Sequence, residues 1–239
     1  FSLPAIAADY VGINDLGASR DNQDGSGASG SYATSIGTWT KASGLASTAV
    51  GSRANAGAES AVAIGASADA TGSAAIALGE ESAASANADT AIGRKSKATG
   101  GQSTAIGSGA AASGNLSSAI GAGATASGIR SLASGSGASA TAGSATAIGT
   151  EAQATATSAT GVGAKAQATA ISSSAYGYNS TASATYATAL GNKATASGTA
   201  STAVGSEANA GGKYSSAFGE YSNAAGDASV AIGAQSSAD

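Results

Sequence analysis

The sequence predicts an all-β protein built as a narrow parallel β-solenoid, and three observations lead to this fold class. Glycine recurs every 14 residues from Gly37 to Gly233, without an insertion or deletion. Five residues after each of these periodic glycines the chain has Ala, from Ala42 to Ala238. Within a unit such as 61–65, small and large side chains alternate, which is the period of a β-strand. Such a regular register indicates a repeat fold rather than a low-complexity tract.

The composition argues against an ordinary packed core. Leu, Ile, Val and Phe make up about 11% of the 239 residues, below the roughly 20% under which globular packing becomes doubtful. The formal net charge of −4 is too small to favour disorder by charge repulsion. The absence of Cys, His and Met removes thiolate and imidazole chemistry and most zinc ligands. We therefore expect no catalytic centre, no cofactor and no metal site, and the acidic balance argues against a nucleic-acid partner.

Each 14-residue unit has room for two strands of about five residues and two tight turns. One turn falls at the periodic glycine and the other near a second glycine, such as Gly72 or Gly128. A helix is not favoured, because Gly recurs too often for helical propensity. We expect each unit to form one coil, with strands of stacked coils paired about 4.8 Å apart.

Side-chain size predicts which residues face inward. Two sheets joined by such short turns leave room for only Ala and Ser between them, so the Ala columns should lie inside. Alternation then turns the large residues of the first strand outward, including Val62 and Ile64. From the second strand it is expected to send out polar residues, namely Arg53, Asn55, Ser67, Asp69, Lys95, Lys97, Glu151, Gln153, Lys165, Gln167, Lys193 and Thr195.

The apolar residue before each periodic glycine forms a continuous ridge that only Ser134 interrupts. A ridge this long exceeds the few hundred Å² of apolar surface that a soluble monomer usually exposes. Another copy around a rotation axis can cover it, and burying each Ile or Leu is worth roughly 1.5 to 3 kcal/mol. We therefore predict an obligate oligomer. Its interface is predicted to contain Ile36, Val50, Ile64, Leu78, Ile92, Ile106, Ile120, Ile148, Val162, Tyr176, Leu190, Val204, Phe218 and Ile232.

The unit at 60–72, SAVAIGASADATG, resembles the SVAIGxxSxAxG head repeat of YadA-like trimeric autotransporter adhesins. The resemblance covers about residues 32 to 239. It implies a left-handed parallel β-roll and a homotrimer around a threefold axis, displayed at the cell surface from the bacterial outer membrane. It also implies attachment to host matrix proteins such as collagen, fibronectin or laminin, or to other heads. The stalk and anchor of that family lie outside this sequence, so we expect a head region.

The repeat divides the chain into a non-repeat segment, 1–31, and a β-roll head, 32–239. Ala5-Ile6-Ala7 resembles the small-residue end of a secretory signal peptide, and an internal linker is the alternative. The stretch 9–13 is a candidate cap for the open end of the first coil.

Two other functions are possible in principle for a β-solenoid. A polysaccharide-processing enzyme would need clustered carboxylates or a base, whereas the 14 acidic residues are scattered along the chain. An ice-binding protein would need a regular Thr array. A Thr column that includes Thr48, Thr104 and Thr188 keeps this alternative open, although it shares the face assigned to the oligomer axis.

Several local features suggest sites only weakly. The stretch 21–25 has a faint calcium-loop pattern but lacks the alternating ligands. Adjacent Glu80 and Glu81 should point to opposite faces, and the basic run 94–97 is expected to be a solvated surface. For the aromatic residues Tyr176, Phe218, Tyr186 and Tyr214, packing at a subunit junction is favoured over a ligand platform.

Overall fold

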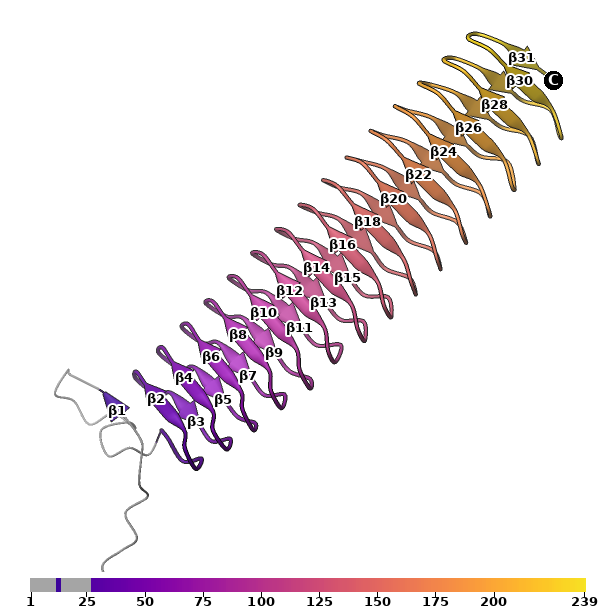
Figure 1. Cartoon of the computed structure of the whole chain (residues 1–239). Coiled ribbons are helices and arrows are strands. Elements are labelled where there is room, and N and C mark those ends of the chain that lie inside the picture. Colours follow the sequence, from indigo (N-terminus) through magenta and orange to yellow (C-terminus); the bar gives the residue numbers. More distant parts are fainter. Residues whose placement is uncertain (1–11, 14–26) are drawn as a thin grey trace, which may run out of the picture. The chain divides into compact units, whose positions relative to one another are not determined.

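The computed structural model describes residues 12–13 and 27–239 of the chain. These residues form β-strands and no helix. They divide into two compact units, the first ending at Leu116 and the second running from Ser117 to Asp239. In both units the chain forms 14-residue coils, each with one three-residue and one two-residue strand (Figure 1). The fold is a parallel β-solenoid of about 15 coils, as the sequence predicts.

In the first unit, the three-residue strands form the first sheet and the two-residue strands the second sheet. The first sheet contains β2 (Thr34–Ile36), β4 (Thr48–Val50), β6 (Val62–Ile64), β8 (Ile76–Leu78), β10 (Thr90–Ile92) and β12 (Thr104–Ile106), preceded by β1 (Gly12–Ile13). The second sheet contains β3 (Lys41–Ala42), β5 (Asn55–Ala56), β7 (Asp69–Ala70), β9 (Ala83–Ala84), β11 (Lys97–Ala98) and β13 (Ala111–Ala112).

The second unit repeats this arrangement. Its first sheet contains β14 (Ser118–Ile120), β16 (Leu132–Ser134), β18 (Thr146–Ile148), β20 (Thr160–Val162), β22 (Ser174–Tyr176), β24 (Thr188–Leu190), β26 (Thr202–Val204), β28 (Ser216–Phe218) and β30 (Val230–Ile232). Its second sheet contains β15 (Thr125–Ala126), β17 (Ser139–Ala140), β19 (Gln153–Ala154), β21 (Gln167–Ala168), β23 (Thr181–Ala182), β25 (Thr195–Ala196), β27 (Asn209–Ala210), β29 (Asn223–Ala224) and β31 (Ser237–Ala238).

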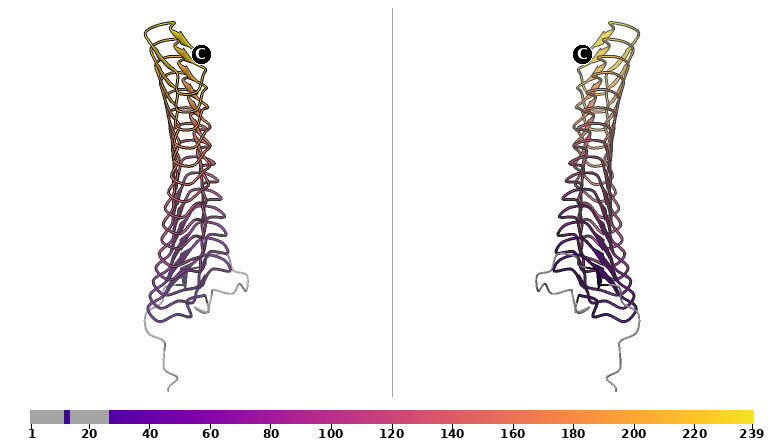
Figure 2. Two further views of the ribbon diagram at one scale, coloured as in Figure 1. Left: turned by 90° about the vertical axis from the view of Figure 1, so that its right-hand side faces the viewer. Right: turned by 90° about the vertical axis from the view of Figure 1, so that its left-hand side faces the viewer.

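Strands of successive coils pair in parallel with their partners 14 residues apart. In the first unit Ala63 pairs with Ala77, and in the second unit Ala133 pairs with Ala147. The views from the two sides show the turns of successive coils aligned along both edges of each unit (Figure 2). Because the period contains no insertion, each column of the sequence becomes a column in space within each unit.

The interior of each coil is made of Ala and Ser. Ala63 and Ala70 are fully buried in the first unit, as are Ala126 and Ala140 in the second. The middle residue of each first-sheet strand points inward, and its two neighbours point outward with partial exposure. The predicted assignment of small residues to the inside is confirmed.

The glycine column has two physical causes. Gly65 has φ +136°, a backbone conformation that L side chains rarely adopt. A Cβ built at Gly65 would also lie 2.5 Å from the carbonyl oxygen of Gly79 in the next coil. Any side chain there would both strain the turn and prevent the coils from stacking.

The strands are shorter than the predicted five residues because each turn contains a left-handed residue. Arg53 has φ 60° in the turn after a periodic glycine, and Ser60 has φ 54° in the opposite turn. A left-handed residue costs roughly 1–2 kcal/mol. Backbone bonding between coils offsets this cost, since the N–H of Arg53 donates to the carbonyl of Thr38 at 2.9 Å and that of Ser60 to Leu45 at 2.8 Å.

At the N-terminal end, β1 pairs with β2, joining Gly12 to Ser35 and Ile13 to Ile36. These two residues belong to the stretch for which the sequence suggests a cap. The rest of that stretch, the signal-like segment and the candidate calcium loop at 21–25 lie outside the described residues.

Candidate functional site

The outer face of the first sheet carries the predicted apolar ridge. All fourteen predicted interface residues occupy the third position of a first-sheet strand and point away from the interior. In a single chain these side chains are half-exposed: Ile64 is 40% and Ile106 is 37% exposed. Stacking within a sheet buries only their flanks, so their tips remain uncovered by the described residues.

A hydroxyl column accompanies the ridge on the same face. Thr48 and Thr104 stand two residues before the ridge residue of their strands and are half-buried, as is Thr188 in the second unit. The Thr array on which the ice-binding alternative depends therefore shares its face with the ridge.

The ridge is irregular at three places in the second unit. Ser134 stands where the neighbouring strands carry Ile120 and Ile148. Tyr176 and Phe218 put rings into the ridge and are 37% and 40% exposed. These two aromatic residues therefore share the predicted interface face, in contrast to Tyr186 and Tyr214, which lie in turns.

The outer face of the second sheet is polar. Asn55 and Asp69 lie side by side in the first unit, with the Asn55 Nδ2 donating to Asp69 Oδ1 at 2.7 Å. In the second unit the Asn209 Nδ2 donates to Asn223 Oδ1, also at 2.7 Å. Like residues in adjacent coils thus pair along the face, which leaves it compatible with water.

The predicted location of the residues two positions after the periodic glycines is wrong. The sequence places Arg53, Ser67, Lys95, Glu151, Lys165 and Lys193 on the second-sheet face, but all of them are left-handed turn residues with φ between 53° and 60°. A positive φ breaks the strict two-residue alternation on which that prediction depends. These side chains therefore line the edge formed by the turns after the periodic glycines, which we call the glycine edge.

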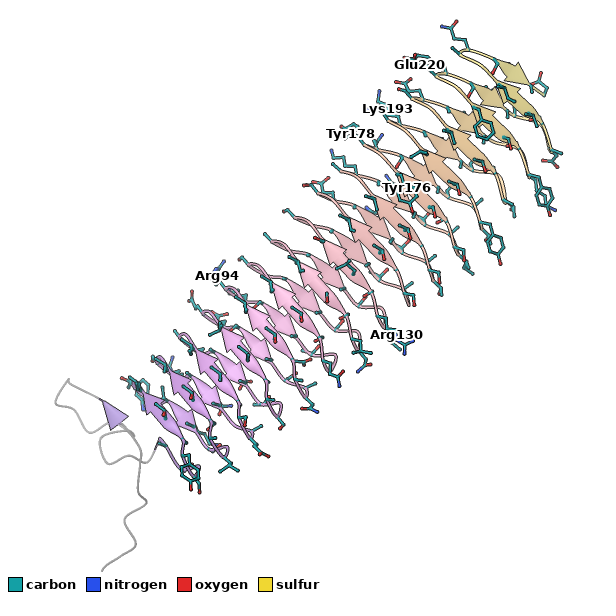
Figure 3. All side chains as sticks on the ribbon, viewed as in Figure 1. Arg94, Arg130, Tyr176, Tyr178, Lys193 and Glu220 are labelled. Carbon is teal, nitrogen blue, oxygen red and sulfur yellow. The ribbon has the colours of Figure 1, made fainter. Side chains whose placement is uncertain are left out.

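Charges on the glycine edge pair between adjacent coils. Lys95 lies 3.5 Å from Glu81, and Lys193 lies 3.2 Å from Glu207. In the second unit Tyr178, Lys193 and Glu220 follow this edge, and Arg130 lies on the opposite edge (Figure 3). Exposed pairs of this kind contribute about 0 to 1 kcal/mol each. Since Lys95 is paired with Glu81, the basic run at 94–97 is partly neutralised.

A buried carboxylate in the first unit is not among the residues predicted from the sequence. Asp89 is fully buried, and its Oδ1 accepts hydrogen bonds from the backbone N–H of Gly101 at 3.0 Å and from the N–H and hydroxyl of Ser103 at 2.9 and 2.8 Å. Its Oδ2 accepts from the N–H of Ala86 at 2.8 Å. Every other periodic unit has Ala or Ser at this position, so the single Asp was the available signal. The carboxylate fastens one turn to the next and reaches no surface.

Chemistry-bearing side chains do not converge on a centre in the described part of the chain. Within residues 27–239 no group of three or more acidic, His or Cys residues could hold a metal ion. Glu80 and Glu81 are consecutive turn residues on the glycine edge and point into solvent. No helix in the described residues is long and apolar enough to cross a membrane. The surfaces of the coils, rather than a pocket, are therefore the candidate sites.

A comparison with known families agrees with this fold. The family model described as the YadA head domain repeat (2 copies) matches residues 28–54, 42–68, 56–82, 70–96, 84–110, 112–138, 126–152, 154–180, 182–208 and 210–236. No curated protein matches the chain. The family and the solenoid fold together point to a non-enzymatic protein of the surface-adhesin type.

Proposed function

The chain belongs to the YadA head domain repeat family, and on that premise we propose that it is the head of a bacterial adhesin displayed at the outer membrane. In this proposal residues 32–239 are the binding head and residues 1–31 precede the repeats. The head attaches the cell to host extracellular matrix or host cells, with matrix proteins such as collagen, fibronectin or laminin as partners.

We further propose that three copies form a left-handed β-roll trimer around the first-sheet ridge. The supporting observation is that ridge side chains such as Ile64, Ile148 and Leu190 are 38% to 48% exposed in a single chain, although they are the largest aliphatic residues of their coils. An identical ridge on a second and third copy supplies an apolar partner of the same 14-residue period. The polar second-sheet face then remains outside.

Attachment in such a trimer comes from repetition. Shallow polar contacts recur every coil along the second sheet and three times around the axis. Each contact is weak, but linked sites gain effective concentration, so that avidity exceeds single-site affinity by about 10²- to 10⁴-fold when the geometry allows simultaneous engagement.

The oligomeric state tests the proposed trimer. Analytical ultracentrifugation at micromolar concentration is expected to give three times the chain mass of 21.8 kDa. A stable folded monomer would overturn the trimer. The same measurement bears on the ice-binding alternative, because a Thr column buried against other subunits cannot meet ice.

A series of shortened heads tests the attachment mechanism. Removing one, three or six 14-residue units in frame keeps the strand register, so the trimer should still assemble and attachment to matrix-coated surfaces should fall progressively. Single outer substitutions such as Lys97→Ala or Gln153→Ala should weaken attachment only slightly. Abolition of attachment by one such substitution, in an intact trimer, would show a discrete site in place of a repeated one.

A further inference from the structure

The second unit carries two exposed tyrosines on the edge opposite the glycine edge. Tyr186 and Tyr214 occupy the same left-handed turn position, with φ 61° and 59°, in coils that are two apart. Their side chains are among the most exposed of the large residues, at 64% and 59%. Between them stands Ala200, whose methyl group leaves both rings uncovered along the edge.

Hydrogen bonds between turns fix the spacing of the two rings. The N–H of Tyr186 donates to the carbonyl of Ile171 at 3.0 Å, that of Ala200 to Thr185 at 2.9 Å, and that of Tyr214 to Thr199 at 2.8 Å. Because paired coils lie about 4.8 Å apart, the two tyrosine positions are separated by about 9.6 Å. The rings are thus held on a rigid scaffold.

Polar groups lie beside Tyr214, whereas Tyr186 has the exposed Ile171 in the adjacent turn. The Lys213 Nζ lies 4.9 Å from the centroid of the Tyr214 ring, and the Asp227 Oδ1 accepts a hydrogen bond from the Lys213 N–H at 2.8 Å. The backbone N–H groups of Thr185 and Thr199 have no acceptor within the described residues. The edge therefore offers two flat apolar surfaces together with free donors, hydroxyls and a carboxylate.

We propose that this tyrosine edge, defined by Tyr186, Tyr214 and the turns between them, binds a linear glycan of uncharged, β-linked sugars. A pyranose ring presents C–H groups on its face, which suit the negative face of an aromatic ring, and hydroxyl groups around its rim, which both donate and accept. In an extended β-linked chain alternate sugars present the same face, and their repeat is comparable to the two-coil spacing. The inference rests on the proposed adhesin function and specifies the chemical class of one receptor.

The charge of the tyrosine edge favours an uncharged glycan over an acidic one. On the edge opposite the glycine edge, the second unit has only Arg130 and Lys213 as cations. The carboxylate of Asp227, which accepts a hydrogen bond from the backbone N–H of Lys213, adds a negative charge to the same edge. A polyanion needs several cations to replace its counterions, and this edge does not supply them.

Two other partners fit the edge less well. A polyproline II peptide has a similar repeat of about 9.3 Å, but its prolines carry no N–H, so they offer no donor to the second oxygen of the Asp227 carboxylate, whereas sugar hydroxyls do. A subunit contact would require continuous apolar surface like the ridge, whereas here Ala200 separates the rings and Lys213 and Thr199 flank them.

The experiment measures binding of the full chain to linear oligosaccharides of six β-linked glucose or N-acetylglucosamine units, by calorimetry and saturation-transfer NMR. Both Tyr186→Ala and Tyr214→Ala should weaken binding roughly two- to tenfold. Tyr186→Phe should retain it, because the ring is kept. Tyr178→Ala and Tyr221→Ala are matched controls: both residues lie on the glycine edge of the same unit, are 51% and 50% exposed, and should have no effect.

Four results would overturn the inference. They are the absence of binding to either oligosaccharide, equal binding by the Tyr186→Ala/Tyr214→Ala double variant, binding of a proline-rich peptide alone, and a smaller assembly mass for the double variant. The last result would make the rings a subunit contact. Matrix attachment by a head that binds neither oligosaccharide would leave the adhesin function standing and refute only this inference.

Discussion

The outer faces of the two sheets differ although their backbones and interiors are alike. Both sheets pair in parallel every 14 residues over a filling of Ala and Ser. The first sheet carries Ile, Val and Leu outward, whereas the second carries Asn, Asp, Gln, Lys and Thr. Because the interior consists almost entirely of Ala and Ser in both sheets, the outer faces are free to diverge. One face can therefore serve assembly while the other remains in water.

The largest effect is expected from a charge on the ridge. Ile148→Lys removes apolar burial worth roughly 1.5 to 3 kcal/mol per copy, or about 5 to 9 kcal/mol in a trimer, and adds a charge to the axis. Ultracentrifugation should show loss of the trimer. Gln153→Lys, on the second-sheet face of the same coil, should leave the mass unchanged. Equal behaviour of the two variants would remove the proposed distinction between the faces.

Overpacking the interior should have the next largest effect. Ala126 is fully buried between the sheets, so Ala126→Leu forces methylene groups into a space sized for a methyl, at a cost of about 1 to 3 kcal/mol or more per chain. Thr125→Leu, one residue earlier and pointing outward, should cost little. Thermal unfolding of the two variants measures the difference, and equal shifts would contradict the inward assignment of Ala126.

A smaller effect is expected where the buried carboxylate joins two turns. Asp89→Ser leaves buried donors at Gly101 and Ser103 without their acceptor, which should cost about 1 to 3 kcal/mol. Urea unfolding measures this loss. Ser117→Ala is the control, because the Ser117 hydroxyl is buried without a partner and its removal should not destabilise. A Ser117→Ala loss as large as that of Asp89→Ser would show that the hydrogen bonds of Asp89 are not the cause.

The smallest effect should come from the ion pairs on the glycine edge. Glu207→Gln breaks the 3.2 Å contact with Lys193, whose side chain is 52% exposed. The expected loss is at most about 1 kcal/mol and should vanish at high salt, where exposed charges are screened. A loss that persists in 1 M salt would indicate a contribution other than this pair.

Most of the fold follows from the sequence because the 14-residue period is uninterrupted. The periodic glycines fix one turn, and the Ala columns fix the interior. Strict alternation places residues such as Arg53 and Glu151 on the wrong surface, because it assumes extended backbone and one positive φ redirects the side chain. The role of Asp89 depends on Gly101 and Ser103, whose donors come from the next coil and cannot be found by considering the coil of Asp89 alone.

Among the predicted interaction residues, those in strands lie where the sequence predicts, whereas those in turns could not be placed from the sequence. Within each unit the ridge residues lie in register on one face, because their column is part of a regular strand. The turn position of Tyr186 and Tyr214 could not be derived, since small residues elsewhere in that column give no indication of where a large side chain would point. The direction of a side chain in a strand can thus be predicted from the spacing alone, whereas in a turn it also depends on the backbone angles.

The alanine interior has a thermodynamic consequence. The heat capacity of unfolding rises with the apolar surface that unfolding exposes, and a buried Ala such as Ala63 or Ala140 exposes little more than a methyl group. The coils should therefore show a heat-capacity change per residue below the typical value of about 12 to 15 cal/mol/K. A small heat-capacity change flattens the curve of unfolding free energy against temperature, so a stack of such coils should retain similar stability over a wide range of temperature.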